Sequence, residues 1–266
     1  QHIETMASVV AGHLDRGDGD SVLLIALSAD TERAGTVVSA VARHITHKRI
    51  DFAVWANESM WWSNQDSQGS RWHRDPFHES IVKAVSHGQV IRPSRASIED
   101  EFSIGSDAMS IAELERLQHA FDVEREREGT VNLSSAIRSV ERLLAEMHIA
   151  TDISHRDCAY IAMWLRQLLV RDHVWFAITP DDARRSLEQW TKIASRLSGV
   201  WRCAPLSLAA FSAWQTGDGV RTLLASEAAL REDPDYSLAA LMLRVVEQGL
   251  PPQSWKQMRS SLRATG

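Results

Sequence analysis

The position of the strand-like segments constrains this chain more than any other feature, because all of them lie before residue 95. The segment "SVLLIAL" at 21–27 is a short continuous apolar run, as expected of a buried strand. The segment "RIDFAVWAN" at 49–57 alternates apolar residues with others, which is the period of a strand. A helical segment at 30–45, capped by Asp30 or Thr31, separates the two. We therefore expect a parallel strand pair with a right-handed crossover.

Further strand-like segments follow in the same part of the chain. "SMWWSN" at 59–64 and "GSRWHR" at 69–74 look like two short strands around a polar loop. "GQVIRPS" at 88–94 looks like a strand that is ended by its proline. Apolar spacing also predicts two helices here, at 3–16 and at 76–86. Pro76 suits the first turn of the second helix.

From Ser97 onward no strand pattern is present, and glycines and prolines divide the chain into helical segments. We expect helices at roughly 107–127, 132–148, 154–170, 180–197, 205–216, 219–232, 236–248 and 252–263. The residues expected in the core of these helices are Ile161, Trp164, Leu165, Leu187, Trp190, Leu206, Phe211 and Leu230.

These patterns predict an α+β fold in three parts. Residues 1–95 are expected to form an α/β subdomain with a short, mostly parallel sheet. Residues 96–150 are expected to form a helical connector, and residues 151–266 a helical bundle or superhelix. Because the chain begins at Gln1 and not at Met, we expect the first part to be incomplete at its N-terminus.

Composition and charge narrow the possible functions. The formal net charge is -6 and acidic and basic residues are intermixed, which argues against the concentrated basic face of a nucleic-acid-binding protein. No apolar run approaches the roughly 18 residues that a membrane span needs, and the N-terminus lacks the basic start of a signal peptide. Cys158 and Cys203 lie in apolar helical segments, so we expect no disulfide, no zinc site and a cytoplasmic location.

The segment "WQTGDGVRTLLASEAALREDPDY" at 214–236 resembles one unit of a tetratricopeptide repeat. In such a unit two antiparallel helices meet at a turn, and a proline follows the second helix. Gly217 and Asp218 fit the turn and Pro234 fits the stop, although Thr222 stands where a small residue is expected. A single unit needs neighbours to bury its apolar surface. We therefore interpret this segment as helical packing and not as an active site.

Several segments carry a resemblance to a known family: "WWS", "GQVIRPSRASIEDEF", "RDHVWFAITPDDARRSLEQWTKI", "APLSLAAFSAWQTGDG", "ALREDPDYSLAALM" and "GLPPQSW". Together they resemble the actinobacterial domain-of-unknown-function family 4192 over nearly the whole chain. The resemblance implies a fold class and no activity. Family members often carry clustered cysteines after "WWS", whereas "NQDSQGSRWHRDPFHE" here has none. The resemblance therefore gives no support for a metal site in this chain.

Two short motifs look catalytic but fit a structural role better. "HRDC" at 155–158 begins like the catalytic loop of protein kinases, but Ala162 stands where that loop needs Asn. We interpret it as the charged first turn of a helix. "GDGD" at 17–20 lacks the Gly-Lys-Ser/Thr of a phosphate loop and the twelfth-position Glu of a calcium loop. We interpret it as a turn that leads into a strand.

One cluster has residues that metals prefer: His73, Asp75, His78 and Glu79. A spacing of five does not place two histidines on one helical face, and a proline interrupts the segment. We expect polar loop residues here and no metal or cofactor.

Tryptophans near "WWS" mark the candidate binding surface. Adjacent residues on a strand point to opposite faces, so Trp61 and Trp62 cannot enter the same core. The candidate surface comprises Trp61, Trp62, Arg71, Trp72, His73 and Arg74. We expect the two short strands to pair and to bring Trp72 close to Trp61 or Trp62, as an aromatic platform with cationic edges. The alternatives are that helices cover both faces of the sheet, or that the tryptophans form an interdomain seam.

Two functions remain open from the sequence. The first is a non-enzymatic interaction module whose helical half binds an unknown partner protein. The second is an enzyme, a hydrolase or a nucleotide-using protein, with its site at the C-terminal ends of the strands. The side chains expected near that edge are Asp30, Asn57, Glu58 and His73. A pocket that holds two or more of them within hydrogen-bond reach would favour the enzyme.

Overall fold

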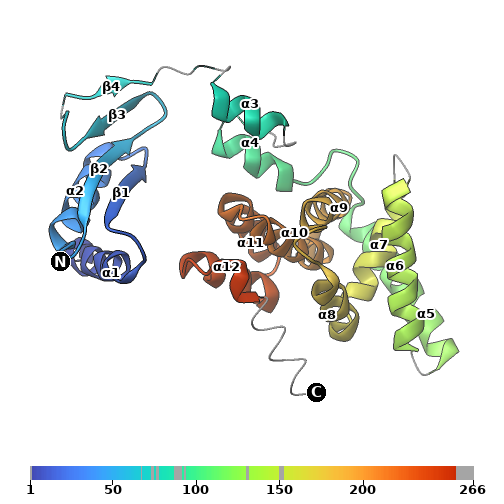
Figure 1. Cartoon of the computed structure of the whole chain (residues 1–266). Coiled ribbons are helices and arrows are strands. Elements are labelled where there is room, and N and C mark those ends of the chain that lie inside the picture. The colour runs from blue at the N-terminus through green and yellow to red at the C-terminus, as the bar shows by residue number, and fades with distance from the viewer. Residues whose placement is uncertain are drawn as a thin grey trace. The chain divides into compact units, whose positions relative to one another are not determined.

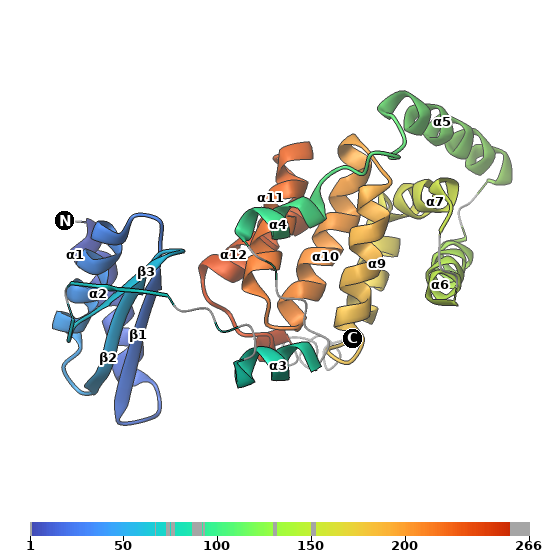
Figure 2. The same cartoon turned by 90° about the horizontal axis from the view of Figure 1, so that it is seen from above.

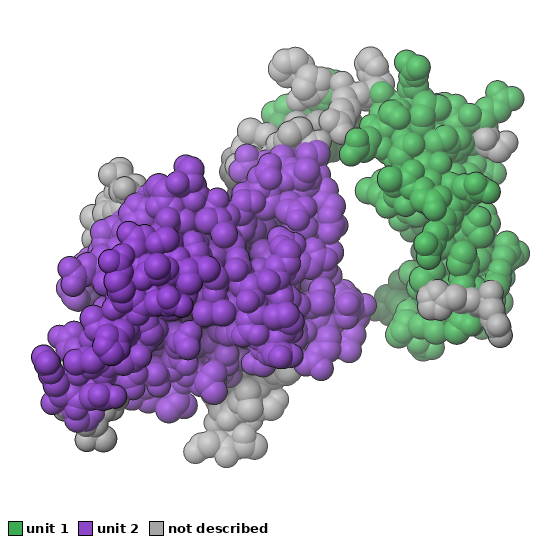
Figure 3. All heavy atoms as spheres, turned by 180° about the vertical axis from the view of Figure 1, so that it is seen from behind, with its two compact units in different colours: residues 1–90 green, residues 91–266 purple. Residues whose placement is uncertain are grey.

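A computed structural model describes residues 2–66, 68–72, 75, 78–86, 92, 94–129, 132–149 and 153–255. The chain divides into two compact units, residues 1–90 and residues 91–266, which are coloured separately in Figure 3. Each unit has a hydrophobic core of its own. The predicted α+β class is confirmed, because a small sheet lies in the first unit and helices make up the second.

The described elements of the first unit are α1 (His2–Arg16), β1 (Ser21–Leu27), α2 (Thr31–His44), β2 (Arg49–Ala56), β3 (Met60–Ser63), β4 (Ser70–Arg71) and α3 (Glu79–Ser86) (Figure 1). The strands form one sheet in the order β1-β2-β3-β4. β1 and β2 are parallel, and the other two pairs are antiparallel. The sheet is therefore mixed, where the sequence predicts a mostly parallel one. The loops on either side of β3 are too short for a crossover, which needs about a dozen residues.

Helices α1 and α2 lie on the same face of this sheet (Figure 2). Val22 and Leu24 of β1 are buried against them, together with Ala53 of β2. Trp55 of β2 lies under Gly35 of α2, where a Cβ atom would come within 3.0 Å of the indole. The absence of a side chain at this glycine therefore lets the helix approach the sheet closely.

The prediction that 21–27 is a buried strand is wrong for one of its faces. Side chains of β1 alternate between buried and exposed along its length, as the period of a strand requires when only one face is covered. A continuous apolar run carries no period of its own, so the sequence gives no sign of which face is covered.

The described elements of the second unit are α4 (Arg95–Glu99), η1 (Asp100–Phe102), α5 (Ile111–Glu128), α6 (Leu133–Ile149), α7 (His155–Leu165), α8 (Leu168–Ala177), α9 (Ala183–Ser195), η2 (Gly199–Arg202), α10 (Cys203–Gln215), α11 (Gly219–Glu232) and α12 (Ser237–Glu247). Every residue of α10 is buried, which is typical of a helix inside a core. It packs against both α9 and α11. Figures 1 and 2 show the row that results, from α12 through α11, α10 and α9 to α7, α6 and α5.

The predicted single helix at 154–170 is two helices. Gln167 has an extended backbone, with ψ of 111°, and separates α7 from α8. The change of direction brings Val170 and Val174 of α8 into the core and leaves Leu168 at the surface. Apolar spacing continues across the break, so the sequence pattern does not reveal it.

Other differences concern the ends of elements. α10 begins at Cys203 and not at 205, which places Pro205 in the first turn, where a helix needs no N–H donor. The helix predicted at 76–86 begins at Glu79, and Pro76 lies outside the described residues. The strand predicted at 88–93 lies outside them except for Arg92, as does the predicted last helix from residue 256 onward. The three-part division at residues 95 and 150 stays a prediction.

Most of the predicted core residues are buried: Ile161, Trp164, Leu165, Trp190, Leu206 and Phe211. Leu187 and Leu230 are half-buried and pack against the core from its edge. The buried residues of α9 are Ala183, Trp190, Ile193 and Ala194. Leu187 lies between Ala183 and Trp190 at helical spacing and is only half-buried, so apolar spacing alone overestimates its burial.

Candidate functional site

Trp61 and Trp62 both lie on β3 and point to opposite faces of the sheet. The register of the strands assigns the faces. Trp62 lies opposite Trp55, which faces α2, whereas Trp61 lies opposite Ala56 on β2 and Ser70 on β4. The predicted pairing of the two short strands is confirmed, and the two tryptophans belong to different surfaces.

Trp62 supports the hairpin that β3 and β4 form. Its indole lies against Gly69, which has a φ of +77°. A Cβ atom at this position would overlap the indole. The site therefore needs glycine twice, for the left-handed backbone and for the space that the ring fills. This cross-strand contact makes Trp62 part of the fold.

The face of the sheet opposite α1 and α2 carries large exposed apolar side chains. On β1, Leu23, Ile25 and Leu27 are 58%, 61% and 75% exposed. Trp61 shares this face by its register. Trp72 directly follows β4 and is 46% exposed, and extending the alternation of β4 by one residue assigns it to the same face. We call these five residues the open sheet face.

Trp72 is held in place although it is exposed. Its indole N–H donates a hydrogen bond to the Asn57 carbonyl oxygen at 2.8 Å. Its backbone N–H donates to the Ser59 carbonyl oxygen at 3.0 Å. Among the described residues, no ring contact joins Trp72 to Trp61 or Trp62. The expected aromatic pair is therefore absent there, because the indole turns toward a carbonyl group of the β2–β3 loop.

The predicted cationic edge of this surface is only partly described. Arg71 is exposed and lies opposite Met60, so it belongs to the face of Trp62 and not to that of Trp72. His73 and Arg74 lie outside the described residues. Their part in the candidate surface stays a prediction.

The side chains predicted at the C-terminal edge of the sheet have structural roles. A carboxylate oxygen of Asp30 accepts a hydrogen bond from the Arg33 backbone N–H at 3.0 Å and so caps α2. The Asn57 side-chain oxygen accepts from two backbone N–H groups of the β2–β3 loop, at 2.8 and 2.9 Å. Glu58 is exposed. Asp30 caps a helix and the Asn57 amide holds a loop, so these two side chains do not form the acid–base pair of a catalytic site.

The helical unit contains a cavity of about 230 Å³ between α7, α8, η2, α10 and the α11–α12 connection. Its charged and polar lining consists of Arg166, Arg171, Asp233 and Tyr236. Sequence reasoning missed these residues, because three separate segments supply them and each is ordinary by itself.

A family model described as "Domain of unknown function (DUF4192)" matches residues 1–253 of the chain. The chain belongs to the DUF4192 family. The resemblance inferred from the sequence is thereby confirmed in family and coverage. No curated protein and no solved structure matches the chain.

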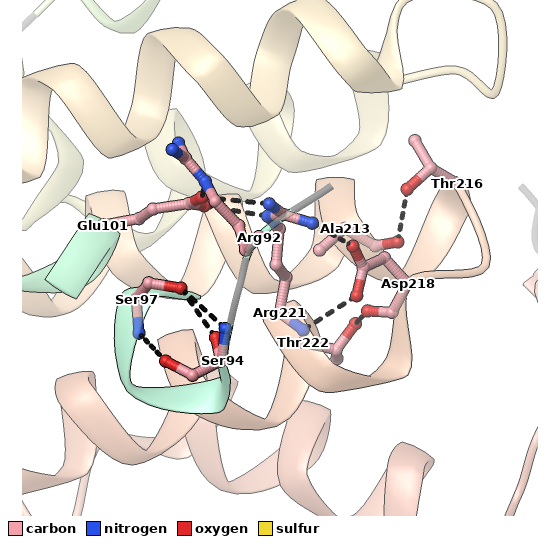
Figure 4. A network of polar contacts seen from close by, with 9 residues as sticks. All are labelled: Arg92, Ser94, Ser97, Glu101, Ala213, Thr216, Asp218, Arg221 and Thr222. Atoms are coloured by element: carbon pink, nitrogen blue, oxygen red, sulfur yellow. Dashed lines mark hydrogen bonds and ion pairs between the residues drawn. The ribbon is translucent and has the colours of Figure 1, made fainter. Parts of the chain in front are cut away.

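The repeat-like segment of this DUF4192 protein forms the helical hairpin α10–α11, and its turn is fixed by a polar network (Figure 4). Asp218 caps α11 by accepting from the Arg221 backbone N–H at 2.9 Å. The Arg221 guanidinium donates to both carboxylate oxygens of Glu101, at 2.8 and 2.9 Å, and Arg92 donates to the same carboxylate at 2.5 Å. Burial alone would raise the pKa of Glu101, but the hydrogen bonds from Arg221 and Arg92 outweigh it and lower the pKa.

The two catalytic-looking motifs have the structural roles that we expected. α7 begins at His155, and the Ser154 side chain caps it by accepting from the Asp157 backbone N–H at 3.0 Å. The "GDGD" segment bends and leads directly into β1.

Within the described ranges, no helix is both long and apolar enough to cross a membrane. The same residues contain no group of three His, Cys, Asp or Glu side chains placed to hold a metal ion. His73, a member of the metal-like cluster in the sequence, lies outside those ranges.

Proposed function

We propose that this protein is a non-enzymatic interaction module and that a partner protein docks on the open sheet face. The supporting observation is the exposure of Leu23, Ile25, Leu27 and Trp72 on one face of a sheet whose other face is packed. Folded proteins seldom leave large apolar side chains clustered in water unless that surface meets another one. This exposure supports the sheet, in preference to the helical half, as the docking surface.

The edge of the sheet suggests the form of the partner. β1 is an outer strand of the described sheet, so one of its edges has no strand partner there. Charged residues and prolines usually protect a strand edge from pairing with another chain. The seven residues of β1, "SVLLIAL", contain neither. A partner with an extended apolar segment would pair with β1 and cover the open sheet face at the same time.

Two matched lysine variants test the proposal. Ile25→Lys places a charge in the middle of the open sheet face. Val9→Lys makes the same change at an exposed position of α1, on the other side of the unit. The full chain and each variant are immobilised, incubated with an extract of the source cells, and the retained proteins are quantified by mass spectrometry. We expect the wild type and Val9→Lys to retain the same partner proteins. Ile25→Lys should retain at least about tenfold less of each of them.

Folding is checked for every variant by circular dichroism and melting temperature. Equal retention by Ile25→Lys and Val9→Lys would reject the open sheet face as the docking surface. Trp72→Ala should keep the fold and weaken retention, because its ring is exposed. Trp62→Ala should lower stability, because its ring packs on Gly69.

We further propose that the protein works in a reducing, cytoplasmic compartment and that its family is mainly actinobacterial. In support of the first, Cys158 and Cys203 are buried and no disulfide joins them. Burial is the main cause that raises the pKa of the Cys203 thiol to about 12, so almost no reactive thiolate forms at neutral pH. Alkylation at neutral pH should modify Cys203 only after unfolding.

A further inference from the structure

The lining of the cavity in the helical unit combines charged and apolar side chains. Its polar members are Arg166, Arg171, Asp233 and Tyr236. The apolar lining consists of Ala162, Leu165, Leu168, Val200, Trp201 and Ala204. Ligand sites commonly have this composition, with mostly apolar walls and a few placed polar groups.

Arg171 is a buried cation in this lining, with only 8% of its surface exposed. Its Nε and Nη2 atoms donate to one oxygen of Asp172, at 2.9 and 2.7 Å. Its guanidinium carbon lies 5.9 Å from the centre of the Tyr236 ring. A side-chain hydrogen bond also joins Arg171 to Tyr236. Because a guanidinium has five N–H donors, these contacts together still leave donors for a ligand. The Asp172 contact also fixes the direction of the group before a ligand arrives.

Two further charges of opposite sign line the same cavity without neutralising each other. In the described part of the chain, neither Arg166 nor Asp233 takes part in an ion pair. One oxygen of Asp233 accepts a hydrogen bond from the Asp235 backbone N–H at 3.0 Å, which leaves its other oxygen for a cation. Charges of both signs that are not paired with each other favour a ligand that carries both charges itself.

The apolar side of the cavity is also fixed. The Trp201 indole N–H donates to the Gln118 side-chain oxygen at 3.3 Å, and its ring is buried. The volume of about 230 Å³ exceeds the roughly 150 Å³ that holds one benzene molecule. It lies below the roughly 300 Å³ at which pockets for drug-sized ligands begin. A single ring or branched chain with a small polar head is therefore the expected size.

We propose that this cavity binds a free α-amino acid with an apolar side chain. The carboxylate lies against the guanidinium groups of Arg171 and Arg166, and the ammonium group lies against Asp233. The side chain of the amino acid packs on Trp201. This site is independent of the open sheet face, because its lining residues all come from the helical unit.

Calorimetric titration of the full chain tests this assignment with chemically matched probes. L-phenylalanine and L-leucine carry both charges, 3-phenylpropanoate lacks the ammonium group, and phenethylamine lacks the carboxylate. We expect saturable binding of at least one amino acid. Each of the two probes with a single charge should bind at least about tenfold more weakly than phenylalanine, because it leaves a charged side chain of the cavity unpaired.

Three variants connect the binding to named residues. Arg166→Gln removes an exposed cation and should lower the affinity for phenylalanine at least about tenfold. Asp233→Asn removes the charge but keeps a side-chain oxygen that can accept from the Asp235 backbone N–H. It should lower the affinity for phenylalanine, whereas 3-phenylpropanoate should bind as well as before or better. Arg156→Gln changes an exposed arginine of α7 outside the cavity and should leave every affinity unchanged.

Three results would overturn the proposal. The first is the absence of saturation by both amino acids below about 10 mM while the protein is folded, since weaker binding would have no specificity. The second is equal affinity for phenylalanine, 3-phenylpropanoate and phenethylamine, which would describe an apolar cavity without a role for its charges. The third is an effect of Arg156→Gln on phenylalanine affinity equal to that of Arg166→Gln.

Discussion

At the scale of single residues, Gly69 leaves the space that the Trp62 indole fills, because glycine has no side chain. Gly69→Ala adds a Cβ atom where the Trp62 indole lies and forces a left-handed backbone on alanine. We expect the free energy of unfolding to fall by about 2–4 kcal/mol, from the backbone cost of roughly 1–2 kcal/mol plus the overlap. Gly19→Ala is the matched control, because Gly19 has a φ of +101° and no atom near its Cβ position. Equal losses in denaturant unfolding would mean that the indole moves aside at little cost.

A second residue-scale feature is the buried cation Arg202, which is 4% exposed. Its Nε donates to the Ala194 carbonyl oxygen at 3.1 Å, its Nη1 to Glu232 at 2.5 Å and its Nη2 to the Phe102 carbonyl oxygen at 2.5 Å. These bonds connect η1, α9 and α11 to the start of α10. The residue therefore joins segments that are far apart in the sequence.

Removing this cation should leave the Glu232 carboxylate and the Phe102 carbonyl oxygen without the Arg202 donor, whereas the Ala194 carbonyl oxygen keeps the Leu197 backbone N–H at 3.3 Å. We expect Arg202→Ala to lower the free energy of unfolding by about 3–5 kcal/mol, as for other broken buried pairs. The exposed pair Arg43–Glu4, at 2.7 Å, is the control, and Arg43→Ala should cost about 1 kcal/mol or less. Comparable losses in chemical denaturation would show that burial does not strengthen the Arg202 contacts.

At the scale of elements, the carboxylate of Glu101 connects η1 with the first turn of α11. Its pKa in the folded protein lies below the usual 4.5. A lowered folded pKa stabilises the protein above pH 4.5, and this contribution is lost as the pH falls through the folded pKa. We expect Glu101→Gln to be less stable than the wild type at pH 7, with the difference shrinking below pH 4.5. A difference that stays constant in denaturant titrations from pH 7 to pH 3 would rule out the charge as its cause.

Another element-scale prediction concerns the packing of α9 on α10. Trp190 is 2% exposed and lies in the buried stripe of α9. Trp190→Ala leaves a cavity between helices, so we expect a loss of about 3–5 kcal/mol in the free energy of unfolding. Glu188→Ala, an exposed change in the same helix, should have little effect. An unchanged melting temperature for Trp190→Ala would remove this residue from the core.

At the scale of the whole molecule, the chain has two hydrophobic cores in two compact units. Units with separate cores commonly unfold in separate steps. We expect two transitions in denaturant unfolding followed by circular dichroism. Gly69→Ala should shift one of them and Trp190→Ala the other. A single transition that both variants shift would show that the units unfold as one cooperative body.

The sequence by itself determined the α+β class, the place of the strands and most of the helices, because the periods of apolar residues are local properties of the chain. It also determined the turn at Gly217 and Asp218, since the residues that form a turn and its cap are neighbours. It identified the family and the short strands around Trp61 and Trp72. It did not show the break at Gln167, where apolar spacing continues from α7 into α8.

Only the tertiary structure decided which surfaces stay open. "SVLLIAL" is apolar on both faces, and its exposure depends on α1 and α2 lying on one side of the sheet. The cavity at Arg171 brings in Asp233 from the end of another helix, and no local pattern links these two residues. Burial and the meeting of distant charges follow from how elements pack, which depends on the whole set of contacts and not on neighbours in the chain.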